Sequence, residues 1–440
     1  MDLLRAATEL FRSPSRTFPV ELWDGSVLPP ARDAGVSGRV ALRRPEALSA
    51  LLPPSSELRT AEAILDGDIE LEGDPIAVLE AAARWAGPRL SAPQLAALLP
   101  VLIRRVISTG LAAPGPGATR LDGRLHSPGR DRAAVRHHYD LSEDFYRLFL
   151  DAELVYSCAY FTDEDTTLED AQRAKLELVC RKLALAPGDR LLDVGCGWGA
   201  LLEHAAARHG VEAVGITLSA NQLAEAKRRL AARAGPAQAS AISADYRLFR
   251  PDRPFTKVAS VGMMEHVGRA RLDEYFLAVD RLLEPGGLFL NHAIAELSAD
   301  VNTFSWLSRR QGGFIQDYIF PDYELVPIAD VIAAAERARF EVRDVESLRE
   351  HYAETLRRWS VRLEARFGEA VALVGARRAR AYRLYLASSA VAFRLGRISV
   401  FQLLLRKRGE AGHVASAPRC RAAWYRGGLG ASTAEPQARG

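Results

Sequence analysis

Three glycines preceded by an aspartate could bind a nucleotide-type cofactor. In the run Asp193-Val-Gly-Cys-Gly-Trp-Gly199, the glycines stand where an apolar strand is expected to end and a helix to begin. Glycine has no Cβ atom, so it permits positive φ angles and lets the backbone approach a ligand closely at the carboxyl end of a strand. Taken alone, such a loop is equally consistent with an ordinary turn between strand and helix.

Two neighbouring features favour S-adenosylmethionine over a dinucleotide as the ligand. The Asp193 carboxylate suits the ammonium group or ribose of S-adenosylmethionine, whereas a pyrophosphate would disfavour a carboxylate so close. The next strand ends in Gly215-Ile-Thr-Leu-Ser219, without the acidic residue that binds a ribose in dinucleotide sites. Thr217, Ser219 and Gln222 could supply neutral hydrogen bonds instead.

Further polar residues follow the later strands. Asp245, after the third strand, is placed to reach the adenine edge, although an aspartate there could equally serve as a turn or cap residue. Glu265 and His266 come directly after the apolar run VASVGMM, and His292 lies within GLFLNHAI. Ligands of parallel sheets bind at the carboxyl ends of the strands, which is where these residues are expected. A histidine at a strand end could also be a hydrogen-bonded core residue.

The composition is that of a globular protein. The chain has 440 residues, 48% hydrophobic and 26% charged, and its formal net charge of +3 is too small to indicate a nucleic acid partner. Its four cysteines lie far apart, with no CxxC pair and no histidine at zinc-ligand spacing, so we predict neither disulfides nor a metal site. No signal peptide and no apolar stretch of the ~20 residues needed to span a bilayer are present, so we expect a cytoplasmic protein.

Strand and helix patterns alternate from Arg190 onward, which predicts an α/β fold with a doubly wound, mostly parallel sheet. Short strand patterns within 18–47 and helical spacing over 73–107 predict a small mixed α+β domain before it. The predicted organisation is a small N-terminal domain (1–110), a linker rich in Gly, Pro and Arg (111–133), a catalytic domain (134–409) and a disordered C-terminal tail (410–440).

Nine blocks carry a resemblance to a known family. In chain order they are HHYDLSEDFYRLFLD, YSCAYF, LLDVGCGWGA, GITLSANQ, MMEHVG, NHAI, YIFPDYEL, HYAETLRRW and YLASSAVAFR. They resemble the cyclopropane-fatty-acyl-phospholipid synthases and the mycolic acid cyclopropane synthases, over roughly residues 134–408. The resemblance implies a class I S-adenosylmethionine-dependent methyltransferase with a Rossmann-like fold. It also implies transfer of a methylene to the cis double bond of an unsaturated phospholipid acyl chain.

The resemblance and the strand ends together predict the residues of the site. The S-adenosylmethionine site would comprise Tyr156, Ser157, Asp193, Gly195, Cys196, Gly197, Trp198, Thr217, Leu218, Ser219, Gln222, Asp245, Tyr246 and Arg247. The resemblance further implies that Cys158, Glu265, His292 and Tyr352 hold a bicarbonate ion beside the reacting carbons.

The chemistry explains why such a reaction needs a buried base. An alkene that accepts the methyl group of a sulfonium becomes a carbocation, and closing the ring requires removal of a proton from the new methyl group. A small bound carbonate species in an apolar tunnel meets that need without a flexible side chain. Glu265 and His292 can share a proton with it, while Tyr352 and the backbone around Cys158 donate hydrogen bonds.

One position departs from the family pattern. The family usually has a cysteine in the block that reads YLASSAVAFR, and it has often been treated as an active-site residue, whereas this chain has Ser389. We keep Ser389 among the catalytic candidates, although no step above needs a thiol. Two alternatives stay open: a fatty-acyl methyltransferase that forms a 10-methylene branch, and a methyltransferase of a soluble small molecule or RNA.

Basic residues beside apolar ones suggest how a lipid could be reached. They gather within 357–366, at Arg377, Arg378, Arg380 and Arg383, and over 406–408. Such patterns suit anionic headgroups, but they are equally typical of solvated helix faces. We therefore expect peripheral contact with the inner face of the membrane and an unsaturated phospholipid as partner, and a homodimer stays open.

Overall fold

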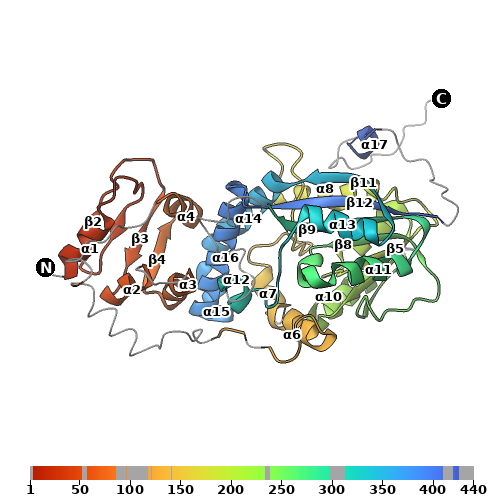
Figure 1. The fold of residues 1–440 in the computed structure, drawn as a ribbon, viewed down its shortest axis with the longest axis horizontal. Helices are drawn as coiled ribbons and strands as arrows, with labels where there is room; N and C mark the ends of the chain where they lie inside the picture. The colour runs from red at the N-terminus through yellow and green to blue at the C-terminus, as the bar shows by residue number, and fades with distance from the viewer. Residues whose placement is uncertain are drawn as a thin grey trace. The chain divides into compact units, whose positions relative to one another are not determined.

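The computed structural model describes residues 3–51, 57–85, 96, 117–119, 121–139, 141–232, 238–297, 313–409 and 420–425 (Figure 1). The chain divides into two compact units. The first unit comprises residues 1–121, 298–321 and 359–395, and the second comprises residues 122–297, 322–358 and 396–440.

The first unit contains a small mixed sheet with the strand order β2-β1-β3-β4. Strand β3 pairs with β1 in parallel and with β4 in antiparallel orientation. The strands are β1 (Val20–Glu21), β2 (Val27–Leu28), β3 (Gly38–Leu42) and β4 (Ile69–Gly73). Its helices are α1 (Leu3–Phe11), η1 (Pro45–Ala47), α2 (Leu48–Leu51), α3 (Glu57–Asp66), α4 (Pro75–Ala83), α12 (Phe314–Tyr318), α15 (Phe367–Val374) and α16 (Ala376–Arg394). The strands expected within residues 18–47 are therefore present.

Helix α16 belongs to this unit because it packs against α3 and α4. Two of its arginines form ion pairs there, Arg377 with Asp66 and Arg380 with Glu70, the latter at 3.5 Å. The preceding helix α14 (Arg349–Ala365) crosses the boundary between the units. The region predicted as one catalytic domain, 134–409, is therefore divided, since residues 359–395 pack with the N-terminal sheet's helices.

The second unit is built on an eight-stranded sheet of the described residues, whose order is β11-β12-β9-β8-β5-β6-β7, with β10 beside β9. The pairings among β5 to β10 are parallel, and those of β12 with β9 and β11 are antiparallel. The strands are β5 (Arg190–Val194), β6 (Glu212–Thr217), β7 (Ala239–Ser243), β8 (Phe255–Val261), β9 (Leu283–Glu296), β10 (Val326–Pro327), β11 (Phe340–Ser347) and β12 (Ile398–Lys407). The predicted doubly wound, mostly parallel sheet is confirmed.

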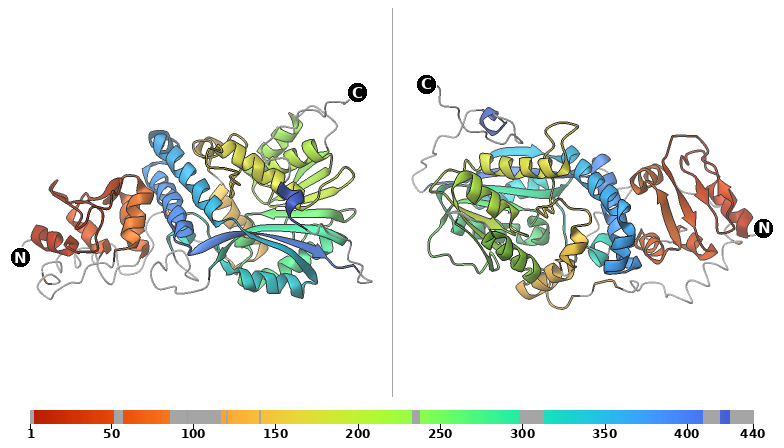
Figure 2. Two further views of the ribbon diagram at one scale, coloured as in Figure 1. Left: turned by 90° about the horizontal axis from the view of Figure 1, so that it is seen from above. Right: turned by 180° about the vertical axis from the view of Figure 1, so that it is seen from behind.

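Helices cover both faces of this sheet (Figure 2). Neighbouring strand residues point to opposite sides, so Leu191 packs in one core cluster with α8 and α9, and Leu192 packs in the other with α11 and α13. The helices are α6 (Pro128–Tyr139), α7 (Glu143–Tyr146), α8 (Leu168–Lys182), α9 (Ala200–His209), α10 (Ala220–Ala231), η2 (Met264–His266), η3 (Arg269–Arg271), α11 (Leu272–Leu282), α13 (Ile328–Arg337) and α17 (Ala422–Tyr425).

Two segments that we predicted to be irregular contain helices. Helix α6 begins at Pro128, so the end of the predicted linker is helical. Helix α17 lies in the predicted tail, where Trp424 packs against the α8 and α9 cluster and the Tyr425 hydroxyl donates to Glu346 at 2.9 Å. Two aromatic residues are enough to hold a polar segment against a domain. The overall composition of the segment does not reveal this. Most of the expected helical region 73–107 lies outside the described residues.

Candidate functional site

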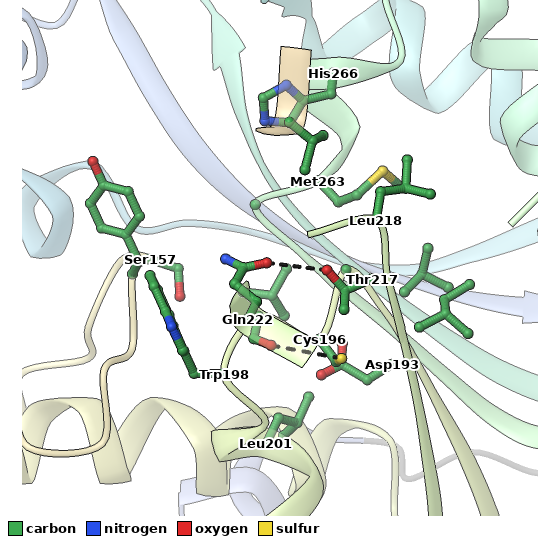
Figure 3. Close-up of a pocket in the computed structure, with 18 of the residues that line it drawn as sticks. Ser157, Asp193, Cys196, Trp198, Leu201, Thr217, Leu218, Gln222, Met263 and His266 are labelled. Atoms are coloured by element: carbon green, nitrogen blue, oxygen red, sulfur yellow. Dashed lines mark hydrogen bonds between the residues drawn. The ribbon is translucent and has the colours of Figure 1, made fainter. Parts of the chain in front are cut away.

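A cavity lies at the carboxyl ends of β5, β6 and β8 in the second unit (Figure 3). All the residues predicted to form the cofactor site line it, except Ser219. Ser219 instead begins α10, where its hydroxyl accepts a hydrogen bond from the Gln222 N–H at 3.3 Å. The tertiary structure therefore brings together residues that are as far apart in the chain as Tyr156 and Arg247. Their role in cofactor binding stays a prediction.

The glycine loop leaves room for a ligand. Gly195, Gly197 and Gly199 have φ angles of +85°, +53° and +87°, which side chains with a Cβ rarely adopt. A Cβ atom on Gly197 would meet no protein atom within 4 Å, whereas one on Gly195 would lie 3.0 Å from the Met263 side chain. The loop therefore presents bare backbone to the cavity and then starts α9.

Two hydrogen bonds of the Thr217 hydroxyl fix the end of β6. The Thr217 hydroxyl donates to Gln222 Oε1 at 3.1 Å and accepts from the Ser219 N–H at 3.2 Å. Because the Gln222 carbonyl is held by Thr217, its amide nitrogen is the group left to donate to a ligand. Figure 3 shows Gln222 and Thr217 side by side at the cavity.

A buried lysine, which the sequence reasoning missed, also lines the cavity. Lys175 on α8 donates to the Ser157 hydroxyl at 2.9 Å and is 2% exposed. Burial lowers the pKa of Lys175 to about 8, against the opposing effect of nearby acids that include Asp193. Burial likewise raises the pKa of Asp193 to about 7, and the Lys175 charge counteracts that rise. The Asp193 Oδ1 atom has no hydrogen-bond partner, which fits a ligand that brings a cation or a hydroxyl to it.

The Asp245 carboxylate is hydrogen-bonded within the protein. Both its oxygens accept hydrogen bonds from the Arg247 guanidinium, at 2.9 and 2.6 Å, and Asp131 pairs with the same guanidinium at 2.9 Å. Asp245 thus organises the turn after β7, as the alternative interpretation held, while it also lines the cavity. A carboxylate has about four acceptor positions, so a contact to a ligand remains available.

Glu265 and His292 do not line this cavity, but each is next to a residue that does: His266 follows Glu265, and the N–H of Gly262 donates to the His292 carbonyl at 2.8 Å. Glu265, in η2, accepts a hydrogen bond from the Ile294 N–H at 2.8 Å, and Ile294 is two residues beyond His292 on β9. Both side chains are buried, and Glu265 Oε2 and His292 Nε2 have no hydrogen-bond partner. The neighbouring His266, rather than Glu265, lines the cavity, and burial lowers its pKa to about 4.

The protonation states of this pair follow from burial. Burial raises the pKa of Glu265 to about 7 and holds that of His292 well below its ordinary value. Gln402 Nε2 lies 3.2 Å from His292 Nδ1 and can only donate, so the ring proton of the neutral histidine is assigned to Nε2. The pair therefore offers one N–H donor and one carboxyl oxygen, which fits a small oxyanion such as bicarbonate.

Cys158 and Tyr352 meet at the start of α14. The Cys158 thiol lies 3.8 Å from the Leu348 carbonyl oxygen, and that oxygen also accepts the Tyr352 N–H at 3.0 Å. Burial raises the pKa of the Cys158 thiol far above its usual range, so the group is a neutral thiol rather than a nucleophile. Burial is the main cause of the pKa shifts of both Cys158 and His292, and the Lys175 charge lowers both pKa values.

Ser389 is the remaining catalytic candidate. It lies on α16, in the first unit, and is 7% exposed. Its relation to the four residues above stays a prediction.

Comparison with known proteins adds family information. A family model described as mycolic acid cyclopropane synthetase matches residues 126–403. The "Probable fatty acid methyltransferase" of Pseudomonas putida is 38% identical over 396 residues, which cover 90% of this chain and 93% of that protein. Cyclopropane mycolic acid synthase 1 of Mycobacterium tuberculosis is 40% identical over 280 residues, which cover 62% of this chain and 97% of that protein.

Solved structures agree with the fold. The cyclopropane synthase MmaA2 of Mycobacterium tuberculosis superposes with a TM-score of 0.60 at 36% identity and covers 65% of this chain and 100% of that chain. The mycolic acid cyclopropane synthase CmaA1, in complex with SAH and CTAB, gives a TM-score of 0.59 at 39% identity, covering 63% of this chain and 98% of that chain.

Proposed function

Because the chain belongs to the mycolic acid cyclopropane synthetase family, and is thus an S-adenosylmethionine-dependent methyltransferase, we propose that it acts on unsaturated fatty acyl chains and closes a cyclopropane ring on their cis double bond. The observation that carries the proposal is the buried pair beside the cofactor cavity. Glu265 Oε2 and His292 Nε2 have no hydrogen-bond partner, although each lies in the core. Buried polar atoms without partners are costly, so such a pair marks a place where a reacting or bound group belongs.

The proposed reaction has two bond-forming steps. The π electrons of the alkene form a bond to the methyl carbon as the carbon–sulfur bond breaks, which releases S-adenosylhomocysteine and leaves a carbocation on the other alkene carbon. A C–H bond of the new methyl group then supplies the electrons for the second ring bond, and its proton must leave. We propose that the Glu265 carboxyl, with a pKa near 7, and the His292 ring help to hold that proton.

We further propose that a bicarbonate ion sits between these groups, and when bound it would supply the base for that proton. Glu265 and His292 would hold it through their free oxygen and N–H, while Tyr352 and the backbone near Cys158 would donate to its other oxygens. The neutral state of the Cys158 thiol agrees with a structural rather than a nucleophilic role.

A phospholipid is the substrate form that we propose, reached by peripheral contact with a membrane. None of the helices in the described part of the chain has the length and apolar character needed to cross a bilayer. Of the basic clusters, the one at 406–408 is the weakest candidate for headgroups, because Arg406 is 7% exposed in β12 and Lys407 donates to the Asp280 and Leu283 carbonyls at 2.6 and 2.9 Å. The arginines of α16 are the better candidates.

A second candidate is a methyltransferase that leaves a 10-methylene branch. It is favoured by the relatives that match over most of this chain's length, since two of them carry the name "Probable fatty acid methyltransferase", whereas the cyclopropane mycolic acid synthases cover 62% of it. Both reactions remove a proton from the new methyl group. The methylene branch forms when a hydride first shifts from the methyl-bearing carbon to the cationic carbon, so that the C–H electrons form a double bond instead of the second ring bond.

One experiment separates the candidates. The protein is incubated with methyl-labelled S-adenosylmethionine and vesicles of unsaturated phospholipid, and the fatty acids are examined by mass spectrometry and proton NMR. We expect label in the lipid and the high-field proton signals of a cyclopropane. Vinylidene signals instead would establish the methylene branch, and absence of lipid labelling would refute both.

A further inference from the structure

Two helices of the second unit bring together a group of side chains that the cofactor cavity does not use. Cys180 lies on α8, and His204 and His209 lie on α9. One ligand atom from each, the thiol sulfur and an imidazole nitrogen of each ring, lies within 4.8 Å of the others. None of the three lines the cavity. The spacing of cysteines in the sequence gave no indication of this cluster, because its members come from different helices.

A carboxylate lies beside the two histidines of the group. Glu177, one helical turn before Cys180, places Oε2 at 3.0 Å from His204 Nε2 and at 3.2 Å from His209 Nε2. Its other oxygen accepts a hydrogen bond from Arg181 Nε at 2.7 Å. Cys180 is fully buried, while the two histidines and Glu177 are partly exposed, which leaves an approach from solvent.

The ligand types select one class of ion. Thiolate and imidazole favour zinc and the other late first-row divalent metals, whereas magnesium and calcium prefer oxygen ligands. Zinc bonds of about 2.3 Å to sulfur and about 2.0–2.1 Å to nitrogen place the ligand atoms of one site roughly 3–4 Å apart. The ligand atoms of the present cluster, which lie within 4.8 Å of one another, would move closer together on binding.

Hydrogen bonding alone gives a competing account. A carboxylate that accepts from two neutral histidines and an arginine is fully satisfied, and it holds α8 to α9 without a metal. That account assigns no role to the Cys180 thiol, whose sulfur lies within 4.8 Å of a ring nitrogen of each histidine. A metal would use all four side chains.

We propose that Cys180, His204 and His209 bind a zinc ion, with Glu177 as the fourth ligand. On binding, the thiol releases its proton to solvent and the histidines bind as neutral rings. The ion would tie α8 to α9 outside the cavity lining. Helix α8 carries Lys175, and α9 begins at the glycine loop. The ion would therefore fix the relative positions of two helices that line the cavity.

Cobalt(II) serves as the probe because tetrahedral cobalt absorbs in the visible and a cobalt–thiolate bond absorbs in the near ultraviolet. Chelator-treated protein is titrated with cobalt and then with zinc. We expect one equivalent of cobalt with both absorptions, displaced by zinc and not by magnesium. In Cys180→Ser the thiolate absorption should vanish and the affinity should fall about 100-fold, and Glu177→Gln should lose about tenfold.

Cys420→Ser is the matched control, because Cys420 is an exposed cysteine outside the cluster. It should bind cobalt like the parent, and far-UV circular dichroism and S-adenosylhomocysteine affinity test whether each variant is folded. The proposal is overturned if the parent shows no thiolate absorption, if that absorption persists in Cys180→Ser, or if it disappears in Cys420→Ser. His204→Asn provides a second variant: if Cys180→Ser does not fold, unchanged cobalt affinity in His204→Asn overturns the site.

Discussion

At the scale of single residues, the second unit holds several ionisable side chains in its core. Glu265 and Asp193 are buried acids whose pKa values rise to about 7, and Lys175 is a buried base whose pKa falls to about 8. Burial of an ionisable group destabilises a fold, so side chains with strongly shifted pKa values are most common at functional sites. Here Asp193 and Lys175 line the cavity, whereas Glu265 belongs to the proposed base.

The first prediction concerns the Glu265 carboxyl. Glu265→Gln should lower product formation about 10²–10⁴-fold with nearly unchanged S-adenosylhomocysteine affinity, because the amide keeps an oxygen for the Ile294 N–H but cannot take part in proton transfer. Removal of dissolved carbon dioxide should slow the parent, and added bicarbonate should restore it. Full activity of the variant, together with indifference to bicarbonate, would falsify the proposed base.

The same residue should make stability depend on pH. A carboxyl whose pKa is raised from 4.5 to about 7 in the folded state contributes stability below pH 4.5 that is lost as pH rises through 7. Relative to the parent, Glu265→Gln should therefore gain unfolding free energy between pH 4.5 and pH 8, by as much as about 3 kcal/mol at 1.36 kcal/mol per pKa unit. Denaturant titrations in carbonate-free buffer measure the difference, and a constant difference across this range would show that Glu265 ionises normally.

At the scale of elements, the glycine loop and the start of α9 shape the cofactor cavity. Gly197→Val should abolish binding of S-adenosylmethionine, because valine is strained at a φ angle of +53° and its side chain would enter the space beside the loop. Calorimetry measures the affinity. Gly129→Val is a suitable control, since Gly129 has open space around it in α6 and lies outside the cavity lining. Equal affinity of Gly197→Val and parent would exclude the loop from the site.

Helix α16 carries the arginines that we propose for lipid headgroups. Arg378 is exposed, whereas Arg377 and Arg380 are paired with Asp66 and Glu70. Changing all three to glutamine should weaken binding to anionic vesicles and leave cofactor affinity intact. Each basic residue near such a surface contributes about 1 kcal/mol, roughly fivefold in affinity, and the paired arginines should contribute less than Arg378.

The control for this prediction carries the same net charge. Arg250, Arg253 and Arg281 are exposed residues of the second unit, and their triple change to glutamine should have a smaller effect in vesicle sedimentation. If both triple variants bind equally, the effect is one of net charge, and α16 is not the docking surface.

At the scale of the whole molecule, one chain builds two units whose segments interleave. The second unit has the mostly parallel sheet expected of a class I methyltransferase, while the first combines the N-terminal sheet with α16 from late in the chain. Arg377 and Arg394 of α16 form ion pairs with Asp66 and Glu80 of the N-terminal segment. Removal of that segment would break both ion pairs and expose the side of α16 that packs on α3 and α4.

The sequence by itself determined the family and the parallel sheet, and all but one of the residues that it predicted for the cofactor site line the cavity. It could do so because ligands of such sheets are contacted at strand ends, and each strand end is a local pattern of a few residues, such as the glycines after Asp193. The blocks around Glu265 and His292 are also short sequence patterns near the ends of strands.

Only the tertiary structure decided which distant side chains meet. Lys175 stands on a helix whose pattern shows just an apolar face, so its burial at the cavity depends on how α8 packs on the sheet. Tertiary packing likewise decides three other features: the pairing of Arg247 with Asp131, the packing of α16 in the N-terminal unit, and the Cys180 cluster. Contacts between separate elements are set by packing of the whole fold, and no short stretch of sequence carries that information.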